Sequence, residues 1–416
     1  MAEKSVYREE VVLEGHIIDS LLLPKVLDTI LEHGGDFELL DVRIGRTRQD
    51  PSFARIAIVA PSETRLDQIL RRIGPHGAVP IEQSDCQLTA ADMDGAFPEG
   101  FYSTTNQPTE VRIKGRWIPV DDQEMDCGIV VDLDSLSARC VPMSRVRAGD
   151  LVVVGHRGIR VVPVKRPELL PESEFGFMTS EVSIEKPKRA LIAWVAEEMR
   201  RIRNAQQKII LVGGPAIVHT GSVPHVCKLI ERGYVDVLFA GNALAAHDIE
   251  HALYGTSLGV YVDRGEPARH GHEHHLRAIN TIRRLGGIAE AVRRGVLKSG
   301  IMYECVRHNV PFVLAGSIRD DGPLPEVITD VLAAQEAMRS HIREAGMALM
   351  IATGLHAIAT GNLLPAEVTT VYVDINPAIV TKIADRGSLQ TVGIVTDVDA
   401  FLRQLVTELE ANQPAG

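Results

Sequence analysis

Cysteine is scarce in this chain, and the features of membrane and secreted proteins are missing. The five cysteines are widely spaced along 416 residues and form no Cys-x-x-Cys pair. An odd, scattered set of this kind is typical of reduced thiols and argues against a disulfide framework or a zinc site. No uncharged run approaches the roughly 18 residues that a membrane-spanning helix needs. Because residues 1–10 are polar and charged, we expect no signal peptide and a cytoplasmic location.

Two further absences reduce the number of functions that the sequence allows. The net charge is −11 and the lysines and arginines are scattered, which argues against a nucleic-acid partner. The short cluster of Arg200, Arg201 and Arg203 is interpreted as a solvated helix face. The chain also lacks Gly-x-Gly-x-x-Gly, the standard fingerprint of dinucleotide-binding folds.

Six apolar runs dominate the C-terminal half, and each ends in a turn that contains Gly, Asn or Asp. The runs are residues 208–215, 235–242, 310–317, 348–354, 370–376 and 391–397. Such runs alternating with helical segments predict a parallel β-sheet covered on both faces. Ligands of these sheets bind at the carboxyl ends of the strands. We therefore expect the binding site at these six turns.

The length predicts two or three domains, and the sequence divides into three. Residues 1–90 show strand, helix, strand, strand and helix patterns, as in a ferredoxin-like α+β module. Residues 91–180 have short strands and frequent turns, which favour a small β-barrel-like domain, and end in a Pro- and Glu-rich linker over 163–187. Residues 181–416 form the predicted α/β domain with a Rossmann-like parallel sheet.

The turns after the first two runs allow two interpretations each. Gly213–Val218 opens a possible helix, so it either binds phosphate at the helix N-terminus or makes a plain tight turn. Asn242 either binds a nicotinamide carboxamide or a ribose, or caps the next helix. Asp248 fits an ordinary charge on a helix surface.

Later turns carry the residues best suited to proton transfer. Arg319, Asp320 and Asp321 follow the third run, and neighbouring carboxylates raise each other's pKa when they are desolvated. The alternative is a plain surface turn. His356 follows the fourth run. Asp374 and Asp397 end the last two, where an acidic residue can bind a ribose diol.

Other chemistry-bearing residues have simpler explanations. The run His270–His275 could bind a metal ion, but it also fits the polar first turn of a helix. We assign no metal. Cys305 lies on an apolar helical face and is expected in the core. Gly100–Asn106 groups hydroxyls and an amide that either contact substrate or cap a turn.

Five segments together resemble one known family. They are Phe101–Asn106, Met125–Cys127, Gly241–Asp248, His275–Asn280 and Gly316–Pro325. The family is the lysine-oxoglutarate reductase/saccharopine dehydrogenase (LOR/SDH) conserved region, which includes archaeal-type ornithine cyclodeaminases and the C-terminal half of cyanobacterial arginine dihydrolases. The chain begins at the small α+β module, so we do not expect arginine hydrolysis.

The resemblance implies an NAD-binding domain similar to deoxyhypusine synthase. The positions that match the family's cofactor site are Asn242, Ala243, Asp321, Thr353, Gly354, Leu355, His356, Asp374, Asp397 and Val398. The family implies that L-ornithine is converted to L-proline and ammonia. We expect Asp320 or Asp321 to act as the acid/base, Arg319 to bind the substrate carboxylate, and His356 to assist near the nicotinamide.

Two alternatives remain open at this stage. One keeps NAD and changes the substrate to lysine or another diamino acid. The other is a sensor that binds NAD and an amino acid without turnover. In each case the expected partner is a small amino acid, with neither nucleic acid nor membrane, and the protein is expected to form a dimer or tetramer.

Overall fold

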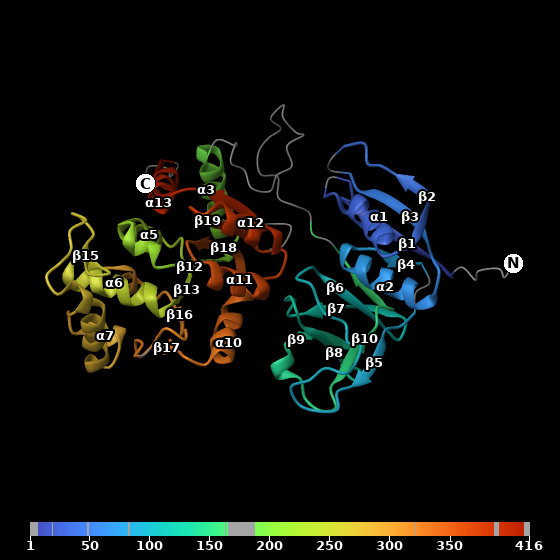
Figure 1. Ribbon diagram of the computed structural model, residues 1–416, viewed down its shortest axis with the longest axis horizontal. Coiled ribbons are helices and arrows are strands. Elements are labelled where there is room, and N and C mark those ends of the chain that lie inside the picture. The colour runs from blue at the N-terminus through green and yellow to red at the C-terminus, as the bar shows by residue number, and fades with distance from the viewer. Residues whose placement is uncertain are drawn as a thin grey trace. The chain divides into compact units, whose positions relative to one another are not determined.

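The computed structural model describes residues 7–18, 20–47, 50–81, 84–162, 164, 188–320, 322–386 and 391–411. It divides into two compact units, Met1–Pro167 with Asn362–Glu367, and Glu168–Gly361 with Val368–Gly416. Figure 1 shows their elements. Nearly all of the predicted linker lies outside the described residues, and the three-domain division stays a prediction.

The first unit begins with the expected α+β module. Its elements are β1 (Tyr7–Gly15), α1 (Leu22–Glu32), β2 (Asp36–Arg43), β3 (Ser52–Ala60), α2 (Glu63–Ile73), the 3₁₀ turn η1 (Gly74–His76) and β4 (Val79–Pro80). The strand order β2-β3-β1-β4, antiparallel throughout, is the ferredoxin-like arrangement. Ser62 caps α2, since its hydroxyl accepts the Arg65 N–H at 3.2 Å.

A seven-stranded sheet makes up the rest of the first unit. Its strands are β5 (Gln87–Ala90), β6 (Thr109–Ile113), β7 (Arg116–Asp121), β8 (Gly128–Asp132), β9 (Ser137–Val141), β10 (Leu151–Val154) and β11 (Ile159–Val161), with the 3₁₀ turn η2 (Met143–Arg145). The order is β11-β6-β7-β9-β8-β10-β5. Lys114 and Gly115, at φ 49° and 78°, make the tight turn of the β6–β7 hairpin. The later segment 362–367 belongs to this unit, and its Ala366 N–H donates to the Asn106 carbonyl at 2.8 Å.

The second unit contains the predicted parallel sheet. Its strands are β12 (Lys208–Gly213), β13 (Val237–Gly241), β16 (Phe312–Ala315), β17 (Val327–Ile328), β18 (Ala345–Ile351), β19 (Thr369–Asp374) and β20 (Thr391–Val395). The order is β17-β16-β13-β12-β18-β19-β20. Apart from the short edge strand β17, this is the Rossmann order 3-2-1-4-5-6, which reverses between β12 and β18.

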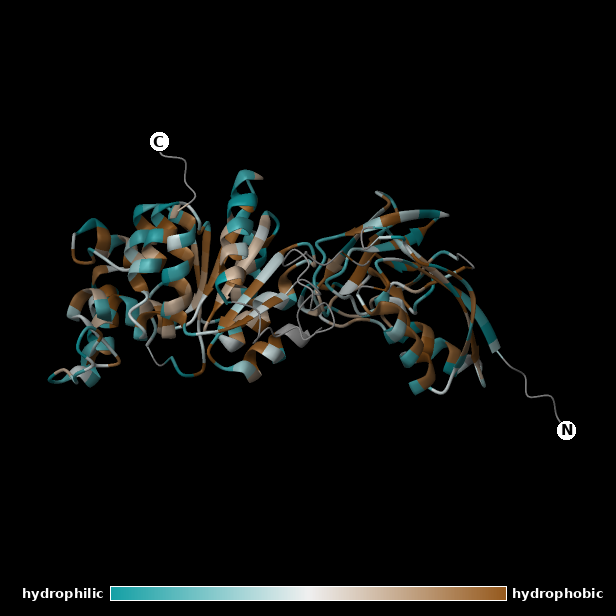
Figure 2. Ribbon diagram, turned by 90° about the horizontal axis from the view of Figure 1, so that it is seen from above, coloured by the Kyte–Doolittle hydropathy of each residue, from teal (hydrophilic) through white to brown (hydrophobic). Residues whose placement is uncertain are grey.

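Helices cover both faces of this sheet. One face carries α3 (Lys188–Asn204), α5 (Val223–Glu231), α6 (Asn242–Tyr254), α9 (Ile301–Arg307) and α13 (Val398–Ala411). On the other side of the strands from α5 and α6 lie α10 (Val331–Ile342), α11 (Gly354–Leu363) and α12 (Pro377–Arg386) (Figure 1). The strands are therefore mostly apolar and are brown in Figure 2, whereas the outer helix faces are teal.

Between α6 and α9 the chain adds a small insertion. It consists of β14 (Thr256–Ser257), β15 (Val260–Tyr261), the 3₁₀ turn η3 (Gly271–Glu273), α7 (His274–Leu285) and α8 (Ile288–Arg293). A short helix α4 (Ala216–His219) follows β12. None of the helices in the described part of the chain is both long and apolar enough to cross a membrane.

Candidate functional site

The strand order brings the polar turns together at the carboxyl edge of the parallel sheet. The reversal of order between β12 and β18 leaves a crevice where ligands of such sheets bind. Gly213–Pro215 follows β12 on one side of this point, and Ala352–Gly354 follows β18 on the other. The predicted site therefore lies at the one place in the fold where the topology favours a ligand.

Gly214 is required for packing at this point. Its N–H donates to the Ile351 carbonyl at 2.9 Å, and a Cβ on Gly214 would lie 1.8 Å from the Ala352 oxygen. The helix that follows, α4, has only four residues, which is too short for a helix macrodipole to favour an anion. The structure shows the tight turn, and phosphate binding at Gly213–Val218 stays a prediction.

Gly214→Ala should therefore lower the free energy of unfolding by about 3 kcal/mol or more, because the new methyl group overlaps backbone that cannot move aside. Urea unfolding followed by circular dichroism measures this. Gly361→Ala in α11 is the matched control, since a Cβ there meets nothing within 4 Å. That variant should be neutral or stabilised by up to about 1 kcal/mol. Equal effects for the two variants would refute the close-approach explanation.

Asn242 links the start of α6 to the loop that follows β16. The N-cap of α6 is Gly241, so of the two interpretations of Asn242 the structure excludes the helix cap. The Asn242 amide donates to Asp320 Oδ1 at 3.1 Å, and its oxygen accepts the Leu324 N–H at 3.1 Å. Asp320 Oδ2 also accepts the Ser317 N–H at 2.7 Å. Asp320 is thus a well-held carboxylate rather than a loose surface charge.

His356 completes a cluster with Asn242 and Asp320 at the ends of β13, β16 and β18. Its imidazole packs against Gly241, where a Cβ would lie 3.1 Å from His356 Cε1. Burial lowers the pKa of His356, and the negative charge of Asp320 opposes this only in part. The ring is therefore neutral at pH 7 and can accept a proton. Arg319 is exposed beside this cluster, and Asp321 lies outside the described residues.

Asp374 and Asp397 mark the ends of β19 and β20. Asp374 accepts the Tyr372 hydroxyl at 3.0 Å and the Asn376 N–H at 2.8 Å. Burial first, and then the Asp374 charge, raise the pKa of Tyr372, which keeps its hydroxyl a donor. Asp397 Oδ1 accepts the Ala400 N–H at 2.9 Å and so caps α13. Asp374 is thus a carboxylate held in one orientation at the edge of the sheet, which suits recognition of a diol.

Three large apolar side chains are exposed at the same edge. Ile318 follows β16 and is fully exposed, Leu355 follows β18 and is 77% exposed, and Ile375 follows β19 and is 69% exposed. Exposed apolar side chains that cluster beside polar groups mark ligand sites, and these three can pack against flat rings. Sequence reasoning named Leu355 only. The signal for the other two was an isoleucine within three residues of a strand end.

Asp248 does not lie on a surface, contrary to the expectation. It is completely buried, and its two oxygens accept the N–H groups of Ile301 and Met302, both at 2.8 Å. Burial raises the pKa of Asp248 to about 7. The residue therefore anchors the start of α9 rather than contributing to a ligand site. Cys305 on α9 is also buried, and burial together with Asp248 raises the pKa of its thiol, so it belongs to the core as expected.

The histidine run His270–His275 contributes to packing. His274 Nδ1 lies 2.8 Å from the hydroxyl of Thr256, which also donates to buried Glu250 at 2.9 Å. Glu250 further accepts from His247 Nδ1 at 2.8 Å. This network joins α6 to the insertion. Across the described ranges, no set of three His, Cys, Asp or Glu side chains is arranged to hold a metal ion.

The sheet order, the reversal point and the polar edge together define a Rossmann-type α/β protein with a ligand site beyond the strand ends. Three family descriptions match consecutive parts of the sequence. They are the LOR/SDH bifunctional enzyme conserved region over residues 8–107, the first region of the ArgZ-like arginine dihydrolase C-terminus over 108–192, and its Rossmann fold over 193–405. The chain belongs to this LOR/SDH and ArgZ-like family.

Relatives in this family match along almost the whole chain. The ornithine cyclodeaminase of Methanothermobacter thermautotrophicus is 56% identical over 401 residues, which are 96% of this chain and 97% of that protein. The apo crystal structure of ArgZ, an arginine dihydrolase from the cyanobacterial ornithine-ammonia cycle, is 40% identical with a TM-score of 0.86. The match covers 99% of this chain but 59% of ArgZ.

A third relative was solved with ligands. The ternary complex of AgrE with ornithine and NAD⁺ is 43% identical with a TM-score of 0.53, over 99% of this chain and 58% of AgrE. The likeness to ArgZ and AgrE therefore concerns a little over half of each of those proteins.

Proposed function

We propose that this protein is an ornithine cyclodeaminase, which converts L-ornithine to L-proline and ammonia with NAD as a catalytic cofactor. The observation that carries the proposal is the 56% identity to an archaeal ornithine cyclodeaminase over nearly the full length of both chains. The AgrE complex, which holds ornithine and NAD⁺, supports the same pair of ligands. In the cell, the reaction would serve proline formation in the cytoplasm, and we propose a homo-oligomer.

The proposed NAD site follows the carboxyl edge of the parallel sheet. Asp374, whose carboxylate is held by Tyr372 and Asn376, would accept both hydroxyls of the adenosine ribose. Asn242 and His356 lie at the ends of other strands and would face the nicotinamide. The proposed contacts are Asn242, Ala243, Asp321, Thr353, Gly354, Leu355, His356, Asp374, Asp397 and Val398.

The residues present suit the acid–base work of this reaction. Bound NAD would supply reversible hydride transfer at Cα of ornithine. The reaction must also move protons among two amines, because the δ-nitrogen bonds to Cα and the α-nitrogen leaves as ammonia. Neutral His356 can accept a proton, and its partner Asp320 stabilises the imidazolium that results. Arg319 is exposed beside them, and its planar guanidinium suits the substrate carboxylate. We keep Asp321 as an alternative acid/base.

Two other functions remain as alternatives. A different diamino acid such as lysine would use the same edge of the sheet. A sensor would bind NAD and an amino acid without turnover. The cluster of Asn242, Asp320 and His356 favours catalysis, because a sensor has no need of a proton acceptor beside the nicotinamide.

Incubating the purified protein with NAD and L-ornithine that carries deuterium at Cα should yield ammonia and L-proline that keeps deuterium at Cα. The hydride leaves this carbon and returns to it, so solvent hydrogen should not enter. Mass spectrometry of the proline, with lysine and 2,4-diaminobutyrate as parallel substrates, measures this. Proline without deuterium would contradict the internal hydride transfer. Turnover of lysine alone would support the first alternative, and NAD binding with no turnover would support the sensor.

A further inference from the structure

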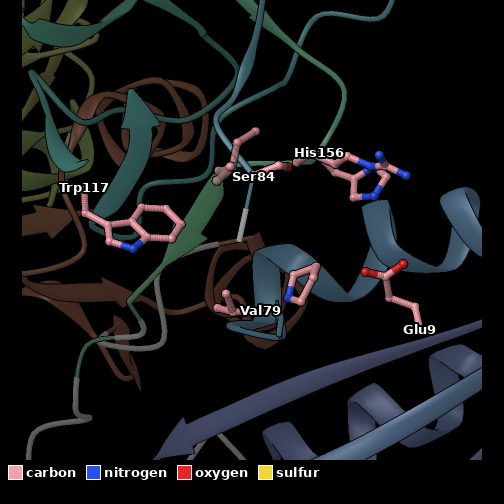
Figure 3. A pocket seen from close by; sticks show the side chains of 9 residues that line it. Glu9, Val79, Ser84, Trp117 and His156 are labelled. Atoms are coloured by element: carbon pink, nitrogen blue, oxygen red, sulfur yellow. The ribbon is translucent and has the colours of Figure 1, made fainter. Parts of the chain in front are cut away.

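The four-stranded sheet of the α+β module has one closed edge and one open edge. β4, at one edge, has two residues, ends at Pro80 and packs against β11. Figure 3 shows Val79 of β4 in a pocket that Trp117 and His156 also line. β2, at the other edge, has eight residues and contains neither lysine nor proline. Short length, lysine and proline are features that protect edge strands, so β2 can accept a further strand.

Apolar side chains are exposed along β2. Leu39 is 44% exposed, Val42 is 39% exposed, and Ile44, just beyond the strand, is 66% exposed. Leu39 lies opposite Ile56 and Val42 lies opposite Ala54, and both of these β3 residues belong to the core under α1 and α2. The apolar row therefore lies on the helix-covered face of the sheet, at its open rim. Exposed apolar groups that gather in this way mark an interaction site.

A β-bulge sets which charged residues of β2 share a face. The pairing of β2 with β3 shifts register at Leu40, so the alternation of side chains is displaced by one position there. Glu38 before the bulge and Arg43 after it therefore lie on the same face, opposite to the apolar row. In this chain they make exposed ion pairs, with Arg8 at 3.6 Å and Asp41 at 3.2 Å. Such pairs contribute little to stability, so both side chains can turn to another partner.

We propose that β2 pairs with β2 of a second copy of this chain and joins two four-stranded sheets into one of eight strands. Strands related by a twofold axis perpendicular to a sheet run antiparallel, and the two copies keep the same face. The two apolar rows would meet on the face that carries α1, which packs against β2 and has Leu31 exposed. The proposal rests on the homo-oligomer put forward above and specifies its interface.

Charge complementarity selects the register of this pairing. With the twofold axis at the bulge, Leu39 lies opposite the partner's Val42, and Glu38 lies opposite the partner's Arg43. Apolar side chains then meet across the interface, and so do opposite charges. With the axis one residue earlier, Glu38 would lie opposite the partner's Asp41, and the like charges would repel. The pairing therefore has one favoured register.

Size-exclusion chromatography with light scattering tests the proposal on the full chain, without NAD or ornithine. At about 50 µM the parent protein should contain an even number of chains. Leu39→Lys combined with Val42→Lys should halve the measured mass while the circular dichroism spectrum stays unchanged. Ile81→Lys is the matched control, because Ile81 is 40% exposed and follows β4 at the other edge of the same sheet. It should leave the mass unchanged.

Charge reversal tests the register, with sedimentation equilibrium as the measurement. Glu38→Arg and Arg43→Glu should each weaken association about 10-fold, because each places two pairs of like charges across the interface. The two changes combined should restore the parent affinity to within about threefold. Arg72→Glu on the exposed surface of α2 is the control and should have no effect. If the lysine variant does not fold, this series decides.

Three results would overturn the proposal. They are a single chain at every concentration, an unchanged mass in the folded lysine variant, and a double charge variant that associates more weakly than either single variant. If another part of the same chain covers β2, the lysine variant should lose stability without a change in mass, which is the second of these results. A larger assembly of unchanged mass would keep the homo-oligomer and reject this interface. Because no turnover is measured, none of these results bears on the proposed reaction.

Discussion

Asp374→Asn is expected to weaken NAD binding roughly 10- to 100-fold. The asparagine keeps an oxygen for the Asn376 N–H but loses the charge and one of two acceptors for the ribose diol. A charge-assisted hydrogen bond contributes about 1.5–3 kcal/mol, and 1.4 kcal/mol corresponds to a factor of ten. Isothermal titration calorimetry with NAD measures the change.

Asp236→Asn is the matched control for that titration. Like Asp374, Asp236 accepts a backbone N–H, that of Ile209 at 2.8 Å. It lies just before β13, at the amino edge of the sheet. Its substitution should leave the affinity for NAD within about twofold. If the two variants lose affinity equally, the effect comes from general loosening of the sheet and Asp374 has no place in the cofactor site.

Asp248→Ala is expected to lower the free energy of unfolding by about 3–4 kcal/mol. It removes both acceptors of the Ile301 and Met302 N–H groups, and each buried donor left unpaired costs about 1–3 kcal/mol. Chemical unfolding at pH 5 measures the loss, because the contribution of Asp248 is smaller above pH 7. The exposed Asp263 provides a control, since Asp263→Ala should change stability by less than about 0.5 kcal/mol. A loss below about 1 kcal/mol for Asp248→Ala would contradict its anchoring role.

The same residue predicts a pH dependence with a definite sign. Burial raises the pKa of Asp248 to about 7 in the folded protein, whereas an unfolded aspartate titrates near pH 4. Between these values the folded state holds a proton that the unfolded chain has released. The contribution of Asp248 to the free energy of unfolding should therefore fall as pH rises from about 4 to about 7. In Asp248→Ala this contribution should disappear.

Sequence patterns predicted well those helices and strands whose own residues carry a local signal, such as amphipathic spacing or a continuous apolar run. Helix α2 is amphipathic and starts at a Ser62 cap, and the six long strands of the parallel sheet are continuous apolar runs. Strand β17 was missed because Val327–Ile328 is too short to have a period, and it exists only by pairing with β16. Its formation depends on tertiary contact, which no local pattern encodes.

The site was predicted as a set of strand ends, and its internal contacts were not. Asn242 meets Asp320 across 78 residues of sequence, and Asp248 anchors a helix that begins 53 residues later. A single sequence does not specify such pairs, so a helix cap stayed an alternative for Asn242 and Asp248 fitted a surface charge. The sequence left the interpretation of the turn at Gly214 open for the same reason. The oxygen that excludes a side chain there belongs to Ala352, which is far away in the sequence.

A crystal structure of the protein with NAD tests the central claim most directly. We predict density for the dinucleotide along the ends of β12, β18 and β19, with the adenosine ribose on Asp374 and the nicotinamide beside His356 and Asn242. Cofactor density elsewhere in the molecule, or crystals that remain empty along this edge at saturating NAD, would contradict the account.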